Sequence, residues 1–177
     1  PNNSICAFNF NNFYYTLNGF EWTKITVGFP GFSVLGDPVL SYDSLGNAYY
    51  VQLYQNGGTY GICIAKSTNK GVTWTSTYNV SSTTVGLSDK EWIAADMTNG
   101  PYSNNLYIVW RQFGSTGMRS VRSTDGGANW SSPQTYTGGQ GAYAAVGANG
   151  SIQGGSVYNA SLNGSSILVN RSTDGGV

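Results

Sequence analysis

The chain has 177 residues, of which only 9% are charged, with eight acidic and eight basic side chains and no histidine. The zero net charge gives no electrostatic reason to expect nucleic acid or an anionic membrane as a partner. The lack of histidine excludes a Ser-His-Asp triad and a histidine-rich zinc site in this span, and no apolar run reaches the roughly 20 residues of a membrane span. The 25 glycines, among abundant Ser, Thr, Asn and Tyr, are typical of a turn-rich, all-β protein.

Turn signals divide the chain into units of short strands. After a strand-like run at 5–8, strands are predicted at 37–43, 47–54, 60–66 and 73–80, then at 89–96, 106–110, 118–122 and from Trp130, and finally at 142–146, 156–162 and 166–171. Residues 62–65 and 106–110 are apolar on both faces, which favours sheets that are covered on both sides. No helical periodicity and no linker interrupts the pattern, so a single domain is predicted.

An octet recurs along the chain at a nearly constant interval. Ser67–Trp74 (STNKGVTW) is repeated as Ser123–Trp130 (STDGGANW) and begins again as Ser172–Val177 (STDGGV). A degenerate copy at 15–22 has Leu17 at the acidic position. The octets begin about every 50 residues, and a period of this size is typical of a repeat architecture.

Each octet combines residue types that build a tight hairpin turn. Ser and Asp two positions apart can bind nearby backbone N–H groups, and the glycine at the fifth position can adopt a positive φ. The tryptophan three residues later can re-enter a strand and clamp the turn. The octet resembles the Asp-box, or BNR repeat, of sialidase-like β-propellers. This resemblance implies four-stranded antiparallel blades, with each box between the third and fourth strands on the face away from the active site.

The resemblance also implies a structural role for the box residues. These residues are Ser67, Asn69, Gly71, Trp74, Ser123, Asp125, Gly127, Trp130, Ser172, Asp174 and Gly176. The implied units are the end of one blade (1–35), two blades (36–86 and 87–138) and an incomplete blade (139–177), or about three to three and a half blades. Because a propeller needs roughly four to eight blades, we expect the chain to require the remainder of a longer polypeptide to close the ring.

Candidate ligand-binding residues lie at the start of the predicted first strands. In propellers that this chain resembles, the inner strands line the central channel and their loops form the binding face. Asp37, and then Asp89, Lys90 and Glu91, hold this position in two successive units. They are expected either to contact a polar ligand or ion at the rim or to cap a turn. Arg111, at the end of a second strand, is a further candidate that could reach the channel.

No catalytic residue, metal ligand or cofactor is predicted in this span. Sialidases of this fold hold a substrate carboxylate with three arginines and add an Asp acid/base and a Tyr–Glu nucleophile pair. Here no arginine precedes Arg111, and Glu21 and Glu91 are the only glutamates. Tryptophan can stack on sugar rings, but core packing is the preferred interpretation of Trp92, Trp110 and Trp130.

Two functions from different classes remain open. The resemblance implies a secreted or cell-surface bacterial propeller that binds a glycan or a surface protein without catalysis, with export by type IX secretion machinery. The alternative is an exo-sialidase or related glycoside hydrolase whose catalytic residues lie outside this segment. Neither predicts nucleic-acid binding or membrane insertion. Cys6 and Cys63 are interpreted as buried thiols, with a disulfide between neighbouring blades as the alternative.

Overall fold

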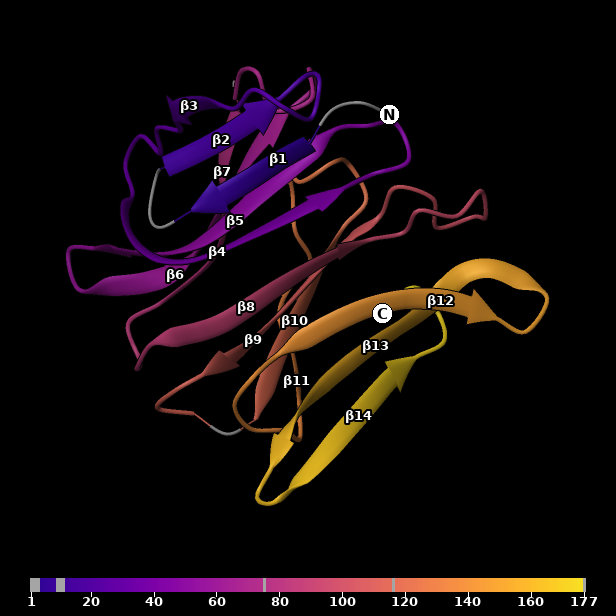
Figure 1. Ribbon diagram of the computed structural model, residues 1–177. Helices are drawn as coiled ribbons and strands as arrows, with labels where there is room; N and C mark the ends of the chain where they lie inside the picture. The colour runs from indigo at the N-terminus through magenta and orange to yellow at the C-terminus, as the bar shows by residue number, and fades with distance from the viewer. Residues whose placement is uncertain (1–3, 9–11, 75, 116, 177) are drawn as a thin grey trace.

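The computed structural model describes residues 4–8, 12–74, 76–115 and 117–176. These ranges hold fourteen β-strands and no helix, so the predicted all-β class is confirmed (Figure 1). The strands form four separate antiparallel sheets of three or four strands, and in each sheet the order in space follows the order in the chain. Within each sheet, every strand is therefore paired with the strands next to it in the sequence.

The four sheets follow one another along the chain. The first contains β1 (Ser4–Phe8), β2 (Asn12–Thr16) and β3 (Thr23–Thr26), and the second contains β4 (Ser33–Tyr42), β5 (Ala48–Asn56), β6 (Thr59–Ser67) and β7 (Ser76–Thr83). The third contains β8 (Ser88–Ala95), β9 (Leu106–Gln112), β10 (Met118–Ser123) and β11 (Gln134–Tyr136), and the fourth contains β12 (Tyr143–Asn149), β13 (Ile152–Asn163) and β14 (Ser166–Ser172).

The last strands of the second and third sheets begin later than predicted. They were expected from Thr73 and Trp130, whereas β7 begins at Ser76 and β11 at Gln134. The tryptophans are still part of the preceding turns, because Trp74 Nε1–H donates to the Gly71 carbonyl at 3.1 Å and Trp130 Nε1–H to the Gly127 carbonyl at 3.0 Å.

One register is repeated in the second, third and fourth sheets. In each sheet a residue of the first strand pairs with one of the second, which pairs in turn with the serine that begins an octet. These rows are Tyr42–Ala48–Ser67, Ala95–Leu106–Ser123 and Val146–Val157–Ser172. The repeat seen in the sequence is thus also a repeat of strand pairing.

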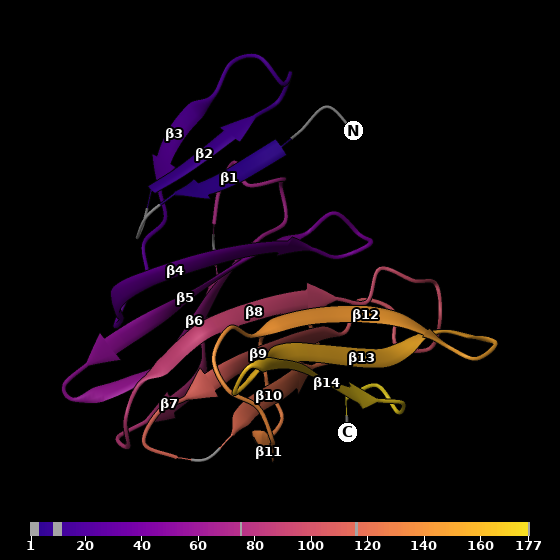
Figure 2. The same cartoon turned by 60° about the horizontal axis from the view of Figure 1, so that its bottom comes forward.

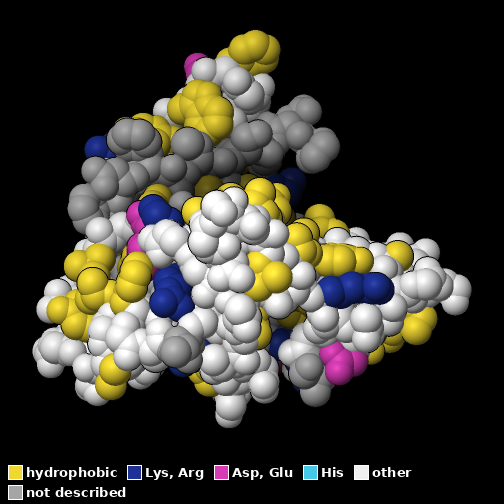
Figure 3. All heavy atoms as spheres, turned by 90° about the horizontal axis from the view of Figure 1, so that it is seen from below, with side chains coloured by type: hydrophobic (Ala, Val, Ile, Leu, Met, Phe, Trp, Pro, Cys, Tyr) yellow, Lys and Arg dark blue, Asp and Glu magenta, His cyan; other side chains and the backbone are white. Residues whose placement is uncertain are grey.

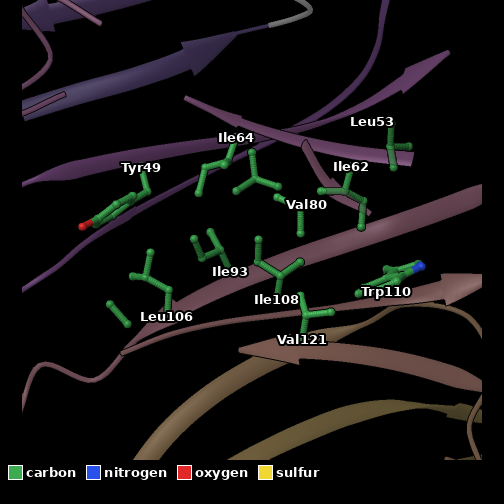
Figure 4. Close-up of a cluster of buried hydrophobic side chains, with 12 residues drawn as sticks. Tyr49, Leu53, Ile62, Ile64, Val80, Ile93, Leu106, Ile108, Trp110 and Val121 are labelled. Carbon is green, nitrogen blue, oxygen red and sulfur yellow. The ribbon is translucent and has the colours of Figure 1, made fainter. Parts of the chain in front are cut away.

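The second and third sheets pack face to face over the largest apolar cluster. Ile62 and Ile64 of β6 point toward Ile93 of β8 and Ile108 of β9, and all four are at most 2% exposed (Figure 4). Burial of each such side chain contributes roughly 1.5–3 kcal/mol, so this interface is a main source of stability.

The opposite face of the second sheet is also buried. The intervening β6 residues, Cys63 and Ala65, pack with Tyr50 of β5 and with Phe13 and Val27 from the first sheet and its following segment. The expectation that residues 62–65 are covered on both faces is therefore confirmed. Cys63 is a free buried thiol, as interpreted from the sequence, whereas the side chain of Cys6 lies outside the described residues.

The first strands of three successive sheets lie side by side. β4 runs next to β8, and β8 next to β12, while the other strands of each sheet extend away from this row (Figures 1 and 2). Charged side chains occupy only small, separate areas of the face seen from below, as expected from the low charge content (Figure 3).

Candidate functional site

Three residues occupy one matching position in the row formed by β4, β8 and β12. Asp37, Lys90 and Gly141 lie five residues before the residues that begin the three register rows, which are Tyr42, Ala95 and Val146. Their backbone conformations also match, because φ is +55° at Asp37, +53° at Lys90 and +80° at Gly141. The structure thus places one left-handed residue at the same point of three successive sheets.

The backbone at two of these positions is strained. A left-handed conformation costs a residue other than glycine roughly 1–2 kcal/mol. The ladder between β4 and β5 shifts between Gly36 and Val39, and that between β8 and β9 shifts between Asp89 and Trp92. Such bulges redirect side chains and are frequent next to functional sites. Strain at two equivalent positions marks this part of the inner strands as a candidate site.

A pocket of about 270 Å³ opens at this position. It is lined by Asp37, Pro38 and Val39, by the equivalent Lys90, Glu91 and Trp92, and by Gly141 and Ala142. The same consecutive positions of three sheets therefore converge on one cavity. Small-molecule sites usually measure roughly 300–1,000 Å³, so this pocket suits a small ligand.

An ion pair crosses the mouth of the pocket. Lys90 Nζ lies 3.1 Å from Oδ2 of Asp37, and both side chains are partly exposed. The hydrogen bond and the charge of Asp37 raise the pKa of Lys90, which therefore stays protonated. The interaction joins β4 to β8 and neutralises the one ammonium group that lines the pocket.

Glu91 has the most unusual environment of the predicted residues. It is 2% exposed, and neither carboxylate oxygen accepts a hydrogen bond from another residue within the described ranges. Burial raises the pKa of Glu91 well above its usual range; its own backbone N–H and Lys90 oppose this shift, and the Asp37 and Asp89 carboxylates add to it. A buried polar group without a partner is rare in folded proteins and requires an explanation.

Trp92 lines the pocket beside Glu91, whereas core packing was the preferred interpretation from its sequence. The side chain packs partly against the apolar cluster between the third and fourth sheets, and its ring centroid lies 4.7 Å from that of Tyr143. The preferred assignment of Trp92 to the core is therefore incomplete. Aligning the first strands so that Asp37 matches Lys90 also matches Val39 with Trp92 and places Gly141 at the position of Asp37. This alignment could have identified Trp92 and Gly141 from the sequence.

Asp89 and Arg111 do not line this pocket. They pair with one another across β8 and β9, and Asp89 accepts a hydrogen bond from Gln140 Nε2. Arg111 donates from Nη1 to the Gly117 carbonyl, and its guanidinium carbon lies 5.6 Å from the centroid of the Phe113 ring. Arg111 thus contacts its own hairpin instead of the pocket.

The octets begin where the third strand of each of these sheets ends, at the opposite end of the sheet from the pocket, and their residues form hydrogen-bonded turns. In the third sheet, the Ser123 hydroxyl donates to Asp125 at 2.8 Å and accepts from Gly127 N–H at 2.9 Å, while Asp125 accepts from Asn129 N–H at 2.9 Å. These bonds lower the pKa of Asp125, although burial acts in the opposite direction. Asp125 is therefore occupied by its own turn.

The other octets repeat this pattern with small changes. Asn69 replaces the aspartate and accepts from Thr73 N–H at 2.9 Å. In the last octet, the Ser172 hydroxyl donates to Asp174 at 2.6 Å and accepts from Gly176 N–H at 2.8 Å.

The degenerate octet is shifted by one residue from the position assigned from sequence. Thr16 takes the place of the serine and accepts from Gly19 N–H at 2.8 Å. Asn18, and not Leu17, takes the place of the aspartate and accepts from Glu21 N–H at 2.9 Å. The assignment of Leu17 is wrong because the turn is one residue shorter, which an ungapped comparison cannot detect.

A second cavity, of about 280 Å³, lies between the third and fourth sheets. Tyr107, Tyr136, Tyr158 and Asn159 are among the residues that line it. Burial raises the pKa of Tyr136 to about 12 despite a hydrogen bond with Ser120. The sequence did not predict this cavity, because it forms where residues of two sheets meet, which no local pattern specifies.

Within the described residues there is no group of three or more potential metal-ligating side chains and no helix that could span a membrane. Comparisons of the sequence with protein-family models and with curated proteins find no match.

Proposed function

We propose that this chain is a segment of a β-propeller of the Asp-box type. The repeated register of three sheets, the side-by-side first strands and the matching turns support this proposal. In such a ring the first strands surround the axis, the pocket lies at the central channel, and the turns lie at the opposite ends of the strands. The proposed setting is a secreted or cell-surface protein of a bacterium, exported by type IX machinery.

The proposed activity is the non-catalytic binding of a small saccharide, free or at the end of a glycan. The observation that carries it is the convergence of the same positions of three sheets on a pocket that contains Glu91 and Trp92. Carboxyl groups can accept hydrogen bonds from sugar hydroxyls, and an indole ring offers an apolar face. Function depends on such a site and not on the fold alone.

Binding can be tested by titrating the purified protein with monosaccharides and short glycans in a calorimeter. Trp92→Ala is expected to weaken binding at least tenfold. Trp22→Ala is a matched control, because Trp22 is 48% exposed on the degenerate turn and does not line the pocket. If no saccharide binds, or if Trp92→Ala binds as the unchanged protein does, the proposed function is wrong.

A glycoside hydrolase is the second candidate. The pocket contains two carboxyl groups in unequal environments, with Glu91 buried and Asp37 ion-paired at the surface. Glycosidases use such pairs, in which the carboxyl group with the raised pKa acts as the acid. Turnover of a fluorogenic sialoside that is lost in Glu91→Gln would favour this alternative. Saccharide binding without turnover of the sialoside would favour the non-catalytic binding protein.

A further inference from the structure

Glu91 lines the pocket and is buried without a partner. Its exposed fraction is 2%, and neither carboxylate oxygen accepts a hydrogen bond from another residue that the structure describes. Buried carboxyl groups are normally paired or hydrogen-bonded. A cationic group that reaches this carboxyl group therefore meets an acceptor that no other described residue occupies.

The charges around Glu91 favour a positively charged ligand. Asp37 from β4 and Asp89 from β8 are negative, and the one ammonium group, on Lys90, is already bound to Asp37. From the other side, the neutral side chains of Tyr50 on β5 and Cys63 on β6 lie close enough to sense the charge of Glu91. Two carboxylates, Asp37 and Asp89, against the one ammonium group of Lys90 leave the surroundings of Glu91 negative, so a cation is attracted and an anion repelled.

The remaining walls suit an organic cation. Trp92 presents an indole beside Glu91, and indole faces attract ammonium groups. The volume of about 270 Å³ fits a ligand no larger than a single sugar.

We propose that this pocket recognises an amino sugar, whose ammonium group binds the carboxylate of Glu91 beside the indole of Trp92. This inference rests on the proposed saccharide binding and specifies the chemical class of the saccharide. Burial keeps the pKa of Glu91 raised in the empty pocket, and an ammonium group favours the ionised carboxylate. Binding therefore transfers the Glu91 proton to solvent.

The test uses calorimetric titration of the complete protein with D-glucosamine, N-acetyl-D-glucosamine and D-glucose. The ammonium form of D-glucosamine is expected to bind at least tenfold more tightly than either neutral sugar. Titration in two buffers with different ionisation enthalpies is expected to reveal proton release with D-glucosamine and none with D-glucose. Equal affinity for all three sugars would overturn the inference while leaving saccharide binding intact.

Glu91→Gln tests the residue assigned to the ammonium group. This variant is expected to lose both the preference for D-glucosamine and the proton release. Glu21→Gln, the same change at the other glutamate, is expected to keep both. If Glu91→Gln does not fold, the proton release of the unchanged protein decides, because its absence contradicts the inference. If none of the sugars binds, the proposed function itself fails.

Discussion

The Nζ atom of Lys90 lies 3.1 Å from Oδ2 of Asp37, and this ion pair joins the same left-handed backbone position of two successive sheets. Gly141 adopts the corresponding conformation in the fourth sheet. A non-glycine residue is unfavourable at such a position, so two side chains are retained there at a cost in stability. The equivalent residues that follow them line the candidate pocket.

The strain at Lys90 can be measured by comparing two substitutions. Lys90→Met removes the ion pair and keeps the strained backbone, and we expect a loss of less than about 1 kcal/mol because the pair is exposed. Lys90→Gly removes the ion pair and also relieves the strain, so it is expected to be more stable than Lys90→Met by about 1 kcal/mol. Urea denaturation of both variants measures this difference. If Lys90→Gly is less stable than Lys90→Met, the backbone at Lys90 is not strained.

The buried carboxyl group of Glu91 is expected to make stability depend on pH. Its pKa in the folded protein is raised by burial, above the value of about 4.3 in an unfolded chain. The folded state thus binds this proton more tightly, and the contribution to stability is complete below about pH 4.3 and is lost as the pH rises toward the folded pKa. Glu91→Gln removes this loss, so its stability relative to the unchanged protein should increase from pH 4 to pH 8.

Urea denaturation at several pH values measures that trend, with Glu21→Gln as the control for losing an exposed carboxyl group. A constant difference between Glu91→Gln and the unchanged protein across this range would show that Glu91 is not buried as a neutral group.

The octet turns predict that asparagine can replace aspartate while alanine cannot. Asp125 accepts from Asn129 N–H, and Asn69 accepts the equivalent bond from Thr73 N–H in the preceding sheet. Asp125→Asn is therefore expected to remain within about 0.5 kcal/mol of the unchanged protein, and Asp125→Ala to lose about 1 kcal/mol. Thermal denaturation distinguishes the two. Equal losses would show that the side-chain acceptor does not stabilise this turn.

Substitutions at the interface between the second and third sheets should lower the stability of the protein far more than substitutions on the exposed face of the fourth sheet. Ile108 is fully buried, whereas Ile167 is 74% exposed. Ile108→Ala is expected to cost about 2–5 kcal/mol because it leaves a cavity, and Ile167→Ala less than about 1 kcal/mol. Chemical denaturation provides both values. Similar losses at the two positions would contradict the assigned core.

The features that could be predicted from sequence are those fixed by local contacts or simple alternation. The octet spacing located the turns because Ser123, Asp125 and Gly127 bond within one short segment. The apolar run at 62–65 indicated burial on both faces because successive strand residues point to opposite sides. The turn at Asn18 was not located correctly from the sequence. It is one residue shorter than the other octet turns, so its side chains have the same roles at a different spacing.

The composition of the pocket could be predicted only in part. Asp37, Lys90 and Glu91 were identified from their place before the first strands, but Asp89 and Arg111 bond elsewhere. Asp89 lies at the bulge of β8, and Arg111 is held by the Gly117 carbonyl of its own hairpin. The contributions of Trp92 and Gly141 depend on how three sheets pack together, which no local pattern specifies.

The most direct test of the account is an experimental structure of the complete protein. We predict that a single rotation axis relates the second sheet to the third and the third to the fourth, with Asp37, Lys90 and Gly141 facing that axis around one pocket. Sheets related by unequal rotations, or first strands that do not surround a shared axis, would contradict the proposed propeller and the site built on it.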